Sequence, residues 1–245
     1  MKPSYLIFSL VLFSRLVYAL PENFVYLKNV DPSILQEMRY AGEHNFVGRQ
    51  IKGYETDACI LTRQSADALA RIQQELKKIS LSLKVYDCYR PTMAVADFMS
   101  WSEDANHQEM KQEFYPHINK ADVFRLGYVA DQSSHSRGST VDITIVPLPV
   151  TTSVEYKKGQ TLISCTAPYA YRFHDNSLDM GTGYDCLDEK SWPWRVEMNS
   201  RAWQNRMVLR SLMMKHGFQP YEKEWWHFTL SHEPYPNTYF NFMVR

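Results

Sequence analysis

Hydrophobic positions repeat at regular intervals along most of this chain and predict its main elements. Leu69, Ile72, Leu76 and Ile79 recur at helical spacing, which predicts a helix over residues 65–79. The same kind of pattern predicts helices over residues 32–40, 92–106 and 200–216, and strands over residues 83–89, 141–146, 218–221 and 225–230. These elements indicate an α+β fold, a single domain with a small central, mostly antiparallel sheet flanked by helices.

Two of the predicted helices have recognisable ends. Ser65 can cap the start of the first of them, and Gly217 marks the end of the last one. Within the last helix, Trp203, Met207 and Met214 form an apolar row, so we expect this helix to be buried against the sheet.

Residues 1–19 have the pattern of a secretory signal peptide. Lys2 is followed by a short apolar core over residues 5–13, and residues 17–19 offer a cleavage site. An uncleaved anchor is the alternative, but this core is too short to span a hydrocarbon layer of about 30 Å as a helix. We therefore expect a mature domain over residues 20–245 that is exported, periplasmic or secreted, without stable membrane insertion.

Charge and cysteine content narrow the class further. The chain has 27 basic and 27 acidic residues without a cluster of either sign, which argues against nucleic acid as a partner. An even number of cysteines in an exported protein favours disulfides over free thiols, and thiolate zinc ligands would need close C-x-x-C pairs, which this sequence lacks. Sequence does not separate the three possible connectivities; we favour Cys59 with Cys88, and Cys165 with Cys186.

Two short segments carry the side chains of a candidate zinc site. The first is S-S-H-S-R-G-S-T-V-D-I-T-I at residues 133–145, which contains His135 and Asp142. The second is E-W-W-H, which adds Glu224 and His227. Two histidines and one carboxylate would leave the fourth position of a tetrahedral zinc open for water, and a nearby carboxylate could take the proton of that water. This pattern indicates a zinc hydrolase.

The surroundings of Asp142 favour a metal ligand over an ordinary polar residue. Strand alternation puts Asp142 on the face opposite Val141, Ile143 and Ile145. An ionised carboxylate in the middle of such a run is costly to bury unless a cation pairs with it. The alternative is that His135 is a polar loop residue and Asp142 a turn or cap residue.

Several motifs of this sequence resemble those of one known family. The motifs S-x-H-x-x-G-x-x-x-D and E-W-W-H resemble those of the VanX-type D-alanyl-D-alanine dipeptidases, a zinc peptidase group that also holds D-Ala-D-Ala carboxypeptidases and Hedgehog domains. D-C-Y-R-P at residues 87–91 is similar to the family's D-G-Y-R-P, with Cys88 in place of glycine, and further segments match at residues 128–130 and 233–237. The resemblance extends from about Tyr40 to the C-terminus.

The resemblance implies a reaction centre at the predicted sheet. One zinc ion per chain would bind His135, Asp142 and His227. Glu224, just before the last strand, would take a proton from the attacking water and deliver it to the leaving amine. Arg90, at a strand end, would stabilise the oxyanion; without the resemblance, an ordinary surface ion pair would be the better interpretation of Arg90.

The resemblance also implies a substrate pocket. Asp185, in D-M-G-T-G-Y-D, would hold the free amino group of a dipeptide, with help from Ser133, and Tyr40 would line the pocket. Without the resemblance, Asp185 would belong to a glycine-rich turn and Tyr40 would be a packing residue on a short helix. We also expect Trp225 and Trp226 to form an apolar wall of the site.

The activity implied is zinc-dependent hydrolysis of D-Ala-D-Ala to two D-alanines in cell-wall peptide metabolism. One alternative is a D,D-carboxypeptidase that acts on longer stem peptides of peptidoglycan. The other is a non-catalytic zinc-containing binding domain, against which the presence of Glu224 and Arg90 argues. The sequence leaves open the oligomeric state, the range of D-dipeptides accepted and the biological role.

Overall fold

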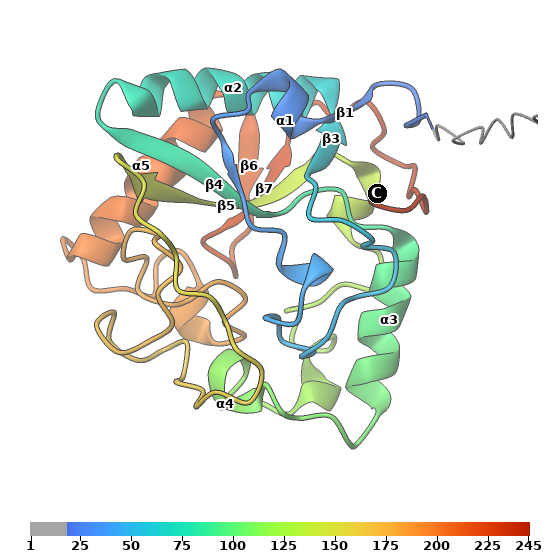
Figure 1. The fold of residues 1–245 in the computed structure, drawn as a ribbon, viewed down its shortest axis with the longest axis vertical. Coiled ribbons are helices and arrows are strands. Elements are labelled where there is room, and N and C mark those ends of the chain that lie inside the picture. Colours follow the sequence, from blue (N-terminus) through green and yellow to red (C-terminus); the bar gives the residue numbers. More distant parts are fainter. Residues whose placement is uncertain (1–18) are drawn as a thin grey trace, which may run out of the picture.

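A five-stranded mixed sheet runs through the middle of the molecule (Figure 1). The computed structural model describes residues 19–245, so the signal peptide expected over residues 1–19 lies outside the described residues apart from its last position. In spatial order the strands are β2 (Leu35–Gln36), β4 (Leu81–Asp87), β5 (Thr140–Pro147), β7 (His227–Leu230) and β6 (Phe218–Pro220). β2 is parallel to β4 and the other neighbours are antiparallel, which confirms the mostly antiparallel sheet.

A second, two-stranded sheet and several helices complete the α+β fold. The small sheet pairs β1 (Phe24–Tyr26) with β3 (Ile60–Thr62). The α-helices are α1 (Leu27–Val30), α2 (Arg63–Lys77), α3 (Thr92–Glu103), α4 (Lys111–Phe114) and α5 (Arg201–Lys215). The 3-10 helices are η1 (Arg39–Ala41), η2 (Lys120–Asp122), η3 (Ser134–Arg137) and η4 (Glu189–Ser191). The predicted strands and the predictions for α2, α3 and α5 are confirmed, with small shifts at their ends.

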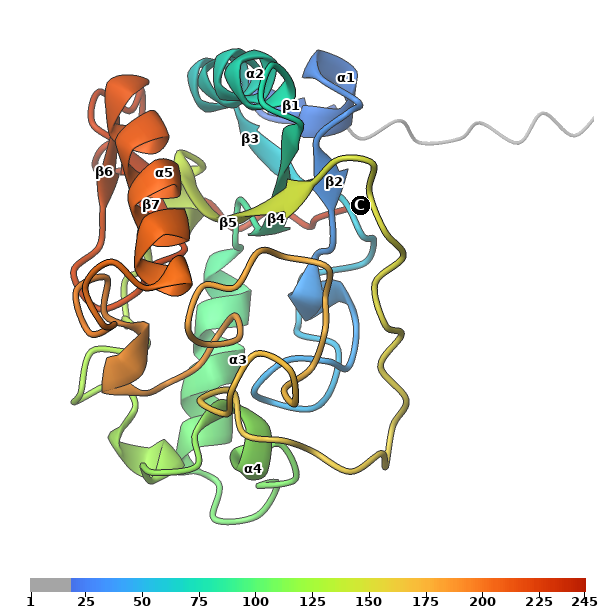
Figure 2. The same ribbon diagram turned by 90° about the vertical axis from the view of Figure 1, so that its left-hand side faces the viewer.

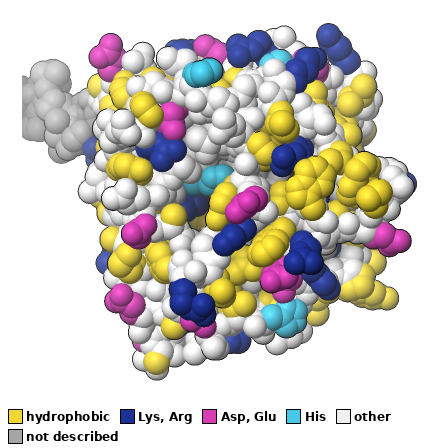
Figure 3. All heavy atoms as spheres, turned by 180° about the vertical axis from the view of Figure 1, so that it is seen from behind, with side chains coloured by type: hydrophobic (Ala, Val, Ile, Leu, Met, Phe, Trp, Pro, Cys, Tyr) yellow, Lys and Arg dark blue, Asp and Glu magenta, His cyan; other side chains and the backbone are white. Residues whose placement is uncertain are grey.

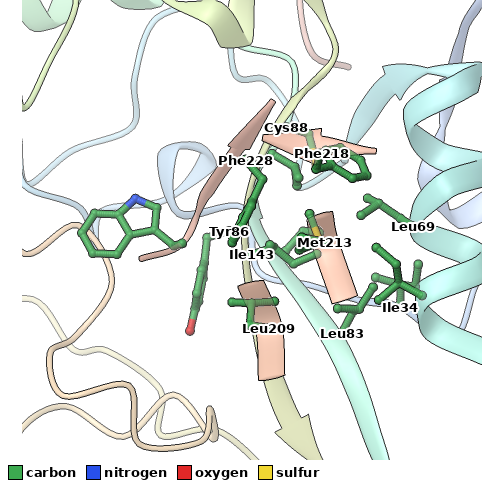
Figure 4. Packing of buried hydrophobic residues seen from close by; sticks show 14 of the residues in the cluster. Ile34, Leu69, Leu83, Tyr86, Cys88, Ile143, Leu209, Met213, Phe218 and Phe228 are labelled. Carbon is green, nitrogen blue, oxygen red and sulfur yellow. The ribbon is translucent and has the colours of Figure 1, made fainter. Parts of the chain in front are cut away.

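The two faces of the large sheet have different roles. Val141 and Ile143 on β5 belong to an apolar core with α2 and α5, whereas Asp142 and Thr144 alternate with them and face the other side. Figure 4 shows side chains of this core, including Ile34, Leu69, Leu83, Ile143, Leu209, Met213, Phe218 and Phe228. α3 and long loops cover the opposite face, as Figure 2 shows. The candidate site therefore lies between the sheet and this loop-rich layer.

A second apolar cluster lies within the loop-rich layer. Phe98 and Trp101 of α3 are buried there, together with Tyr40 and Phe46. The rings of Tyr40 and Phe98 lie 5.1 Å apart between centroids. This cluster supports the wall of the site from the side away from the sheet.

The helix predicted over residues 32–40 is wrong. Its middle forms β2, whose Leu35 and Gln36 pair with Lys84 and Val85 of β4, and only its last two residues enter η1. Hydrogen bonding to the edge of the sheet, including Glu37 N to Val85 O at 2.9 Å, replaces the local helical preference.

Two of the confirmed helices, α2 and α5, differ in detail from their predictions. α2 begins two residues before Ser65, which is buried in its first turn and accepts a hydrogen bond from Thr62 Oγ1 instead of capping the helix. Ile79 lies beyond the end of α2 and is largely exposed. The apolar row predicted for α5 is also wrong, since Met214 is exposed at 51%. The buried row is Ala202, Arg206, Leu209 and Met213.

Two disulfides restrain segments that lie outside the helices and strands. Cys59 is bonded to Cys88 and Cys165 to Cys186, the pairing that we favoured. Cys165 lies in a long segment after β5 that has no helix or strand before η4.

Within residues 19–245 no helix has the length and apolar character needed to cross a membrane. Acidic and basic side chains are interspersed on the face drawn in Figure 3.

Candidate metal centre

Three neighbouring strands bring acidic and imidazole side chains into one row across the sheet. Asp142 on β5 is in register with His227 at the start of β7 and with Asp87 at the end of β4. His135 comes from η3, which ends at Gly138 with a φ of 82° just before β5 begins. This left-handed turn lets the chain reverse so that His135 lies close to Asp142.

The three predicted ligands form a nearly equilateral triangle. His135 Nε2, Asp142 Oδ1 and His227 Nδ1 lie 3.3 Å from one another in each pair. Tetrahedral zinc with ligands at about 2.0 to 2.1 Å separates its donor atoms by about 3.3 to 3.4 Å. The donor set therefore fits one face of a zinc tetrahedron, and the fourth corner remains for water or substrate.

Each predicted ligand has one polar atom in the triangle, and its remaining polar atom contacts a neighbouring group that orients the side chain. His135 Nδ1 donates to the carbonyl oxygen of Cys88 at 2.7 Å, and His227 Nε2 lies 3.3 Å from Ser134 Oγ. Asp142 Oδ2 accepts a hydrogen bond from the Tyr184 hydroxyl at 2.9 Å, while Oδ1 is buried without any hydrogen-bond partner. Metal-binding histidines and carboxylates are typically held in this way, with the ligating atom left free.

Electrostatics at the triangle also favour a cation. Burial raises the pKa of the Asp142 carboxyl, but the neighbouring imidazoles of His135 and His227 outweigh burial and hold that pKa well below its usual range. Burial lowers the pKa of His227, yet its contacts with Asp142 and Glu224 raise that pKa to about 9. The site thus stabilises positive charge between these side chains, and a bound metal ion would provide that charge.

A cavity of about 350 Å³ opens onto the triangle, and all eight predicted site residues line it. Glu224 lies three residues before His227 and just outside β7, as expected. Because the chain is not a regular strand there, both side chains reach the same site, and Glu224 Oε2 lies 3.4 Å from His227 Nδ1. Glu224 is 8% exposed, so its carboxylate borders the cavity while most of the side chain is shielded from water.

Arg90 lies beside the triangle with its guanidinium fixed on several sides. Its Nε donates to Asp87 Oδ2 at 2.9 Å, and its Nη2 lies 3.7 Å from Asp142 Oδ2. The guanidinium carbon lies 5.1 Å from the centre of the Tyr40 ring, which adds a cation–π contact. Ser133 Oγ, 3.5 Å from Arg90 Nη1, borders the same part of the cavity.

Asp185 places a second carboxylate in the cavity, apart from the triangle. Its Oδ2 accepts a hydrogen bond from the Tyr40 hydroxyl at 2.8 Å, and its backbone has a φ of 54°. Burial raises its pKa well above the usual value, repulsion from Asp142 adds to this, and the Tyr40 hydrogen bond and Arg90 oppose it. A carboxylate in this environment would gain from a cationic partner such as an ammonium group.

Sequence reasoning missed three supporting residues and misplaced two others. Asp87, which holds Arg90 and lies 3.5 Å from His135 Nδ1, stood inside the D-C-Y-R-P segment. Tyr184 stood beside Asp185 in G-Y-D, and nothing in the sequence pointed to Ser134. The expected wall of Trp225 and Trp226 is wrong, because both rings are buried in the core and are absent from the cavity lining.

Comparison with known proteins agrees with this geometry. The family model of peptidase M15, described as D-Ala-D-Ala dipeptidase, matches residues 21–156 and 149–245. The chain belongs to the M15 family. It is therefore a member of a metallopeptidase family, with the His-Asp-His triangle as its candidate metal site.

Several M15 relatives cover nearly the whole chain. A D-alanyl-D-alanine dipeptidase of Enterococcus faecalis is 35% identical over 222 residues, which are 91% of this chain and 98% of the relative. One of Enterococcus faecium is 33% identical over 224 residues, with 91% and 98% covered. One of Escherichia coli is 29% identical over 202 residues, which are 81% of this chain and 80% of the relative.

Proposed function

We propose that this protein hydrolyses D-Ala-D-Ala to two D-alanines, using one zinc ion held by His135, Asp142 and His227. The observation that carries this proposal is the triangle of donor atoms at 3.3 Å, with Glu224 Oε2 3.4 Å from one of them in the same cavity. The names of the M15 relatives support the substrate. When bound, zinc supplies a Lewis acid that polarises the scissile carbonyl and lowers the pKa of water.

Glu224 moves the proton in the proposed reaction. Its carboxylate accepts a proton from the water that attacks the carbonyl carbon, and a carbon–oxygen bond forms. Glu224 then delivers the same proton to the nitrogen of the leaving D-alanine as the carbon–nitrogen bond breaks. The 3.4 Å contact between Glu224 Oε2 and His227 Nδ1 supports this role, because the carboxylate lies next to the donor triangle.

Arg90 stabilises the negative charge that develops on the carbonyl oxygen. Its guanidinium is already held by Asp87 and by the rings of Tyr40 and Phe98, so little reorganisation is needed when the charge forms. Asp87 therefore acts as a positioning residue for Arg90.

Asp185 and its neighbours select the free amino end of the dipeptide. The Asp185 carboxylate pairs with the substrate ammonium, Tyr40 orients that carboxylate, and Ser133 adds a polar contact. Asp185 is buried, so an N-blocked peptide or a longer chain would leave it without a cation. This arrangement favours a dipeptidase over a D,D-carboxypeptidase of longer stem peptides.

We further propose that the protein acts outside the cytoplasm, after removal of residues 1–19. The two disulfides support this location because such bonds persist in oxidising compartments. An exported dipeptidase would recover D-alanine from wall fragments, and it would not deplete newly made cytoplasmic dipeptide. Comparing the growth of a deletion strain and its parent on D-Ala-D-Ala tests this role, which equal growth would contradict.

The activity is tested with the purified mature chain. D-Ala-D-Ala should yield two D-alanines, a chelator should stop the reaction and added zinc should restore it. N-acetylated dipeptide and a pentapeptide ending in D-Ala-D-Ala should be left intact. Release of one D-alanine from the pentapeptide would favour the carboxypeptidase, and zinc binding without any cleavage would favour a binding domain.

A further inference from the structure

Each disulfide of this chain includes a cysteine that is directly adjacent to the machinery of the proposed reaction. Cys88 follows Asp87 at the end of β4 and comes two residues before Arg90. Cys186 immediately follows Asp185. Cys88 and Cys186 are both fully buried.

The Cys59–Cys88 disulfide fixes the segment behind the donor triangle. β4 ends at Asp87, and residues 88–90 lie beyond its strand pairing with β5. Two backbone hydrogen bonds hold them, from Tyr89 N to Ile60 O at 2.9 Å and from Arg90 N to His135 O at 3.3 Å, and the disulfide adds a covalent restraint. The carbonyl oxygen of Cys88 accepts the hydrogen bond from His135 Nδ1 at 2.7 Å that orients this imidazole. Cys59 immediately precedes β3, and the disulfide therefore joins this segment to a second sheet.

The Cys165–Cys186 disulfide fixes the segment that carries Asp185. This part of the chain lies in irregular structure, and the left-handed φ of 54° at Asp185 is costly for a residue with a side chain. Backbone bonds support it: Gly183 N donates to Cys165 O at 2.9 Å, and Leu187 N donates to Phe114 O at 2.7 Å. The disulfide lies between these two contacts and adds a covalent restraint one residue from the carboxylate.

We infer that the two disulfides position different halves of the site. Cys59–Cys88 holds the metal-binding and oxyanion half through the Cys88 carbonyl and Arg90. Cys165–Cys186 holds the ammonium-binding half through Asp185. This inference rests on the proposed function and deepens it, because it makes four cysteines positioning residues for the reaction.

The alternative is that each disulfide only stabilises the fold as a whole. Each disulfide serves as the control for this effect in the other. They close loops of similar size, with sequence separations of 29 and 21 residues. The chain entropy removed from the unfolded state depends on the logarithm of loop length, so both should stabilise the fold to a similar extent. A difference in what each disulfide does to zinc binding and kinetics would therefore reflect position and not stability.

The experiment compares the wild-type mature chain with Cys59→Ala/Cys88→Ala and with Cys165→Ala/Cys186→Ala. Zinc affinity is measured by competition with a chromophoric chelator, and kcat and KM are measured with D-Ala-D-Ala at saturating zinc. All three proteins are assayed well below their melting temperatures. If a variant does not fold, the wild-type protein is first folded with both disulfides formed and then treated with a phosphine. Mass spectrometry identifies which disulfide has opened, and the same assays follow.

The two losses should differ in kind. Without Cys59–Cys88, zinc affinity should fall about 10- to 100-fold and kcat should fall, as when partners of metal ligands are lost, while KM changes little. Without Cys165–Cys186, KM should rise by about tenfold while zinc affinity and kcat stay nearly unchanged. This is the signature of a lost contact that binds the ground state and the transition state equally.

Two results would overturn the inference. One is wild-type zinc affinity and kinetics in both variants, and the other is the same change in the same parameters in both. A wild-type chain that does not cleave D-Ala-D-Ala would instead contradict the proposed function. In that event the zinc affinities still test the inference. Equal zinc affinities in Cys59→Ala/Cys88→Ala and in the wild type would overturn it.

Discussion

Among single residues, Asp142 shows most clearly how the candidate metal centre is built, because its two carboxylate oxygens have different surroundings. Oδ2 is held by the Tyr184 hydroxyl, while Oδ1 faces the two imidazoles without a hydrogen bond. His135 and His227 are divided in a similar way. In each imidazole one ring nitrogen contacts a supporting group outside the triangle, and the other faces the remaining two ligands. Three side chains thus present one donor atom each to a single point.

Sequence could predict the residues of this centre better than the residues that support them. His135, Asp142 and His227 are of the types that zinc binds. Motifs that resemble those of the VanX-type family pointed to them, and to Glu224 and Arg90. Supporting contacts depend on the folded backbone: the hydroxyl of Ser134 meets His227 because η3 and β7 lie side by side. No spacing in the chain encodes that contact between residues 93 positions apart.

Replacing Glu224 separates chemistry from metal binding. Glu224→Gln keeps the size of the side chain but cannot accept a proton, so kcat for D-Ala-D-Ala should fall about 10²- to 10⁴-fold. Zinc content, measured by elemental analysis, should remain that of the wild type, because Glu224 is not one of the three ligands. Glu222→Gln is the matched control, since Glu222 is exposed and should keep full activity. Unchanged turnover in Glu224→Gln would exclude its role as the base.

Asp185 should make the stability of the zinc-free protein depend on pH. Burial, with repulsion from Asp142, raises the pKa of Asp185 in the folded state above its unfolded value. Its stabilising contribution is therefore full below the unfolded pKa and is lost as pH rises through the folded pKa. The amide in Asp185→Asn does not titrate. The melting temperature of this variant relative to the wild type should therefore increase as pH rises from the unfolded pKa of Asp185 to its folded pKa.

Thermal unfolding of chelator-treated proteins across a pH series measures this difference. The control is Asp131→Asn, because Asp131 is exposed. Its melting temperature should differ from that of the wild type by a constant amount. A pH-independent difference for Asp185→Asn as well would contradict the argument from burial.

At the scale of elements, the site depends on short irregular connections between regular strands and helices. Periodicity predicted α2, α3 and α5 because their apolar spacing is local information. It failed for residues 32–40, where pairing with β4 decides the structure, and for the buried face of α5. There Arg206 is buried because its guanidinium donates to the carbonyl oxygens of Met180, Lys190 and Trp192.

The turn at Gly138 should be the most sensitive connection in the centre. Gly138 has a φ of 82°, and a Cβ there would lie 2.2 Å from Phe24 Cε1. Gly159 has the same φ of 82°, but nothing lies within 4 Å of its Cβ position. Gly138→Ala should therefore cost stability through both strain and collision, and displace His135 from Asp142, whereas Gly159→Ala meets strain alone.

Chemical denaturation and zinc competition assays compare the two glycine variants. Gly159→Ala should lose about 1 kcal/mol, the cost of left-handed backbone, and keep wild-type zinc affinity. Gly138→Ala should lose more stability and bind zinc more weakly. Equal effects of the two substitutions would show that the turn at Gly138 does not set the geometry of the triangle.

At the scale of the whole molecule, one metal ion would join segments that are far apart in sequence. The donors come from η3, β5 and β7, and the cavity that they border is completed by η1 and by the segment containing Asp185. A ligand that binds only the folded chain stabilises it in proportion to the logarithm of its concentration over its dissociation constant. Zinc should therefore stabilise the entire domain and not the site alone.

Removal of zinc should lower the melting temperature measurably. At free zinc 1,000 times its dissociation constant, the stabilisation is about 4 kcal/mol. For a domain of this size that corresponds to a shift of about 10 °C. Calorimetry of chelated and zinc-loaded protein measures the shift, and His227→Ala should show a much smaller one. An equal shift in His227→Ala would place the bound zinc elsewhere on the chain.

A zinc titration of the metal-free mature chain, with D-alanine released from D-Ala-D-Ala as the readout, tests whether one zinc ion at this site is required for hydrolysis. If the proposed zinc site is correct, no D-alanine is released without metal, release rises linearly on addition of zinc, and it saturates at one zinc per chain. Release of D-alanine by the metal-free chain, or no release at any zinc concentration, would contradict it.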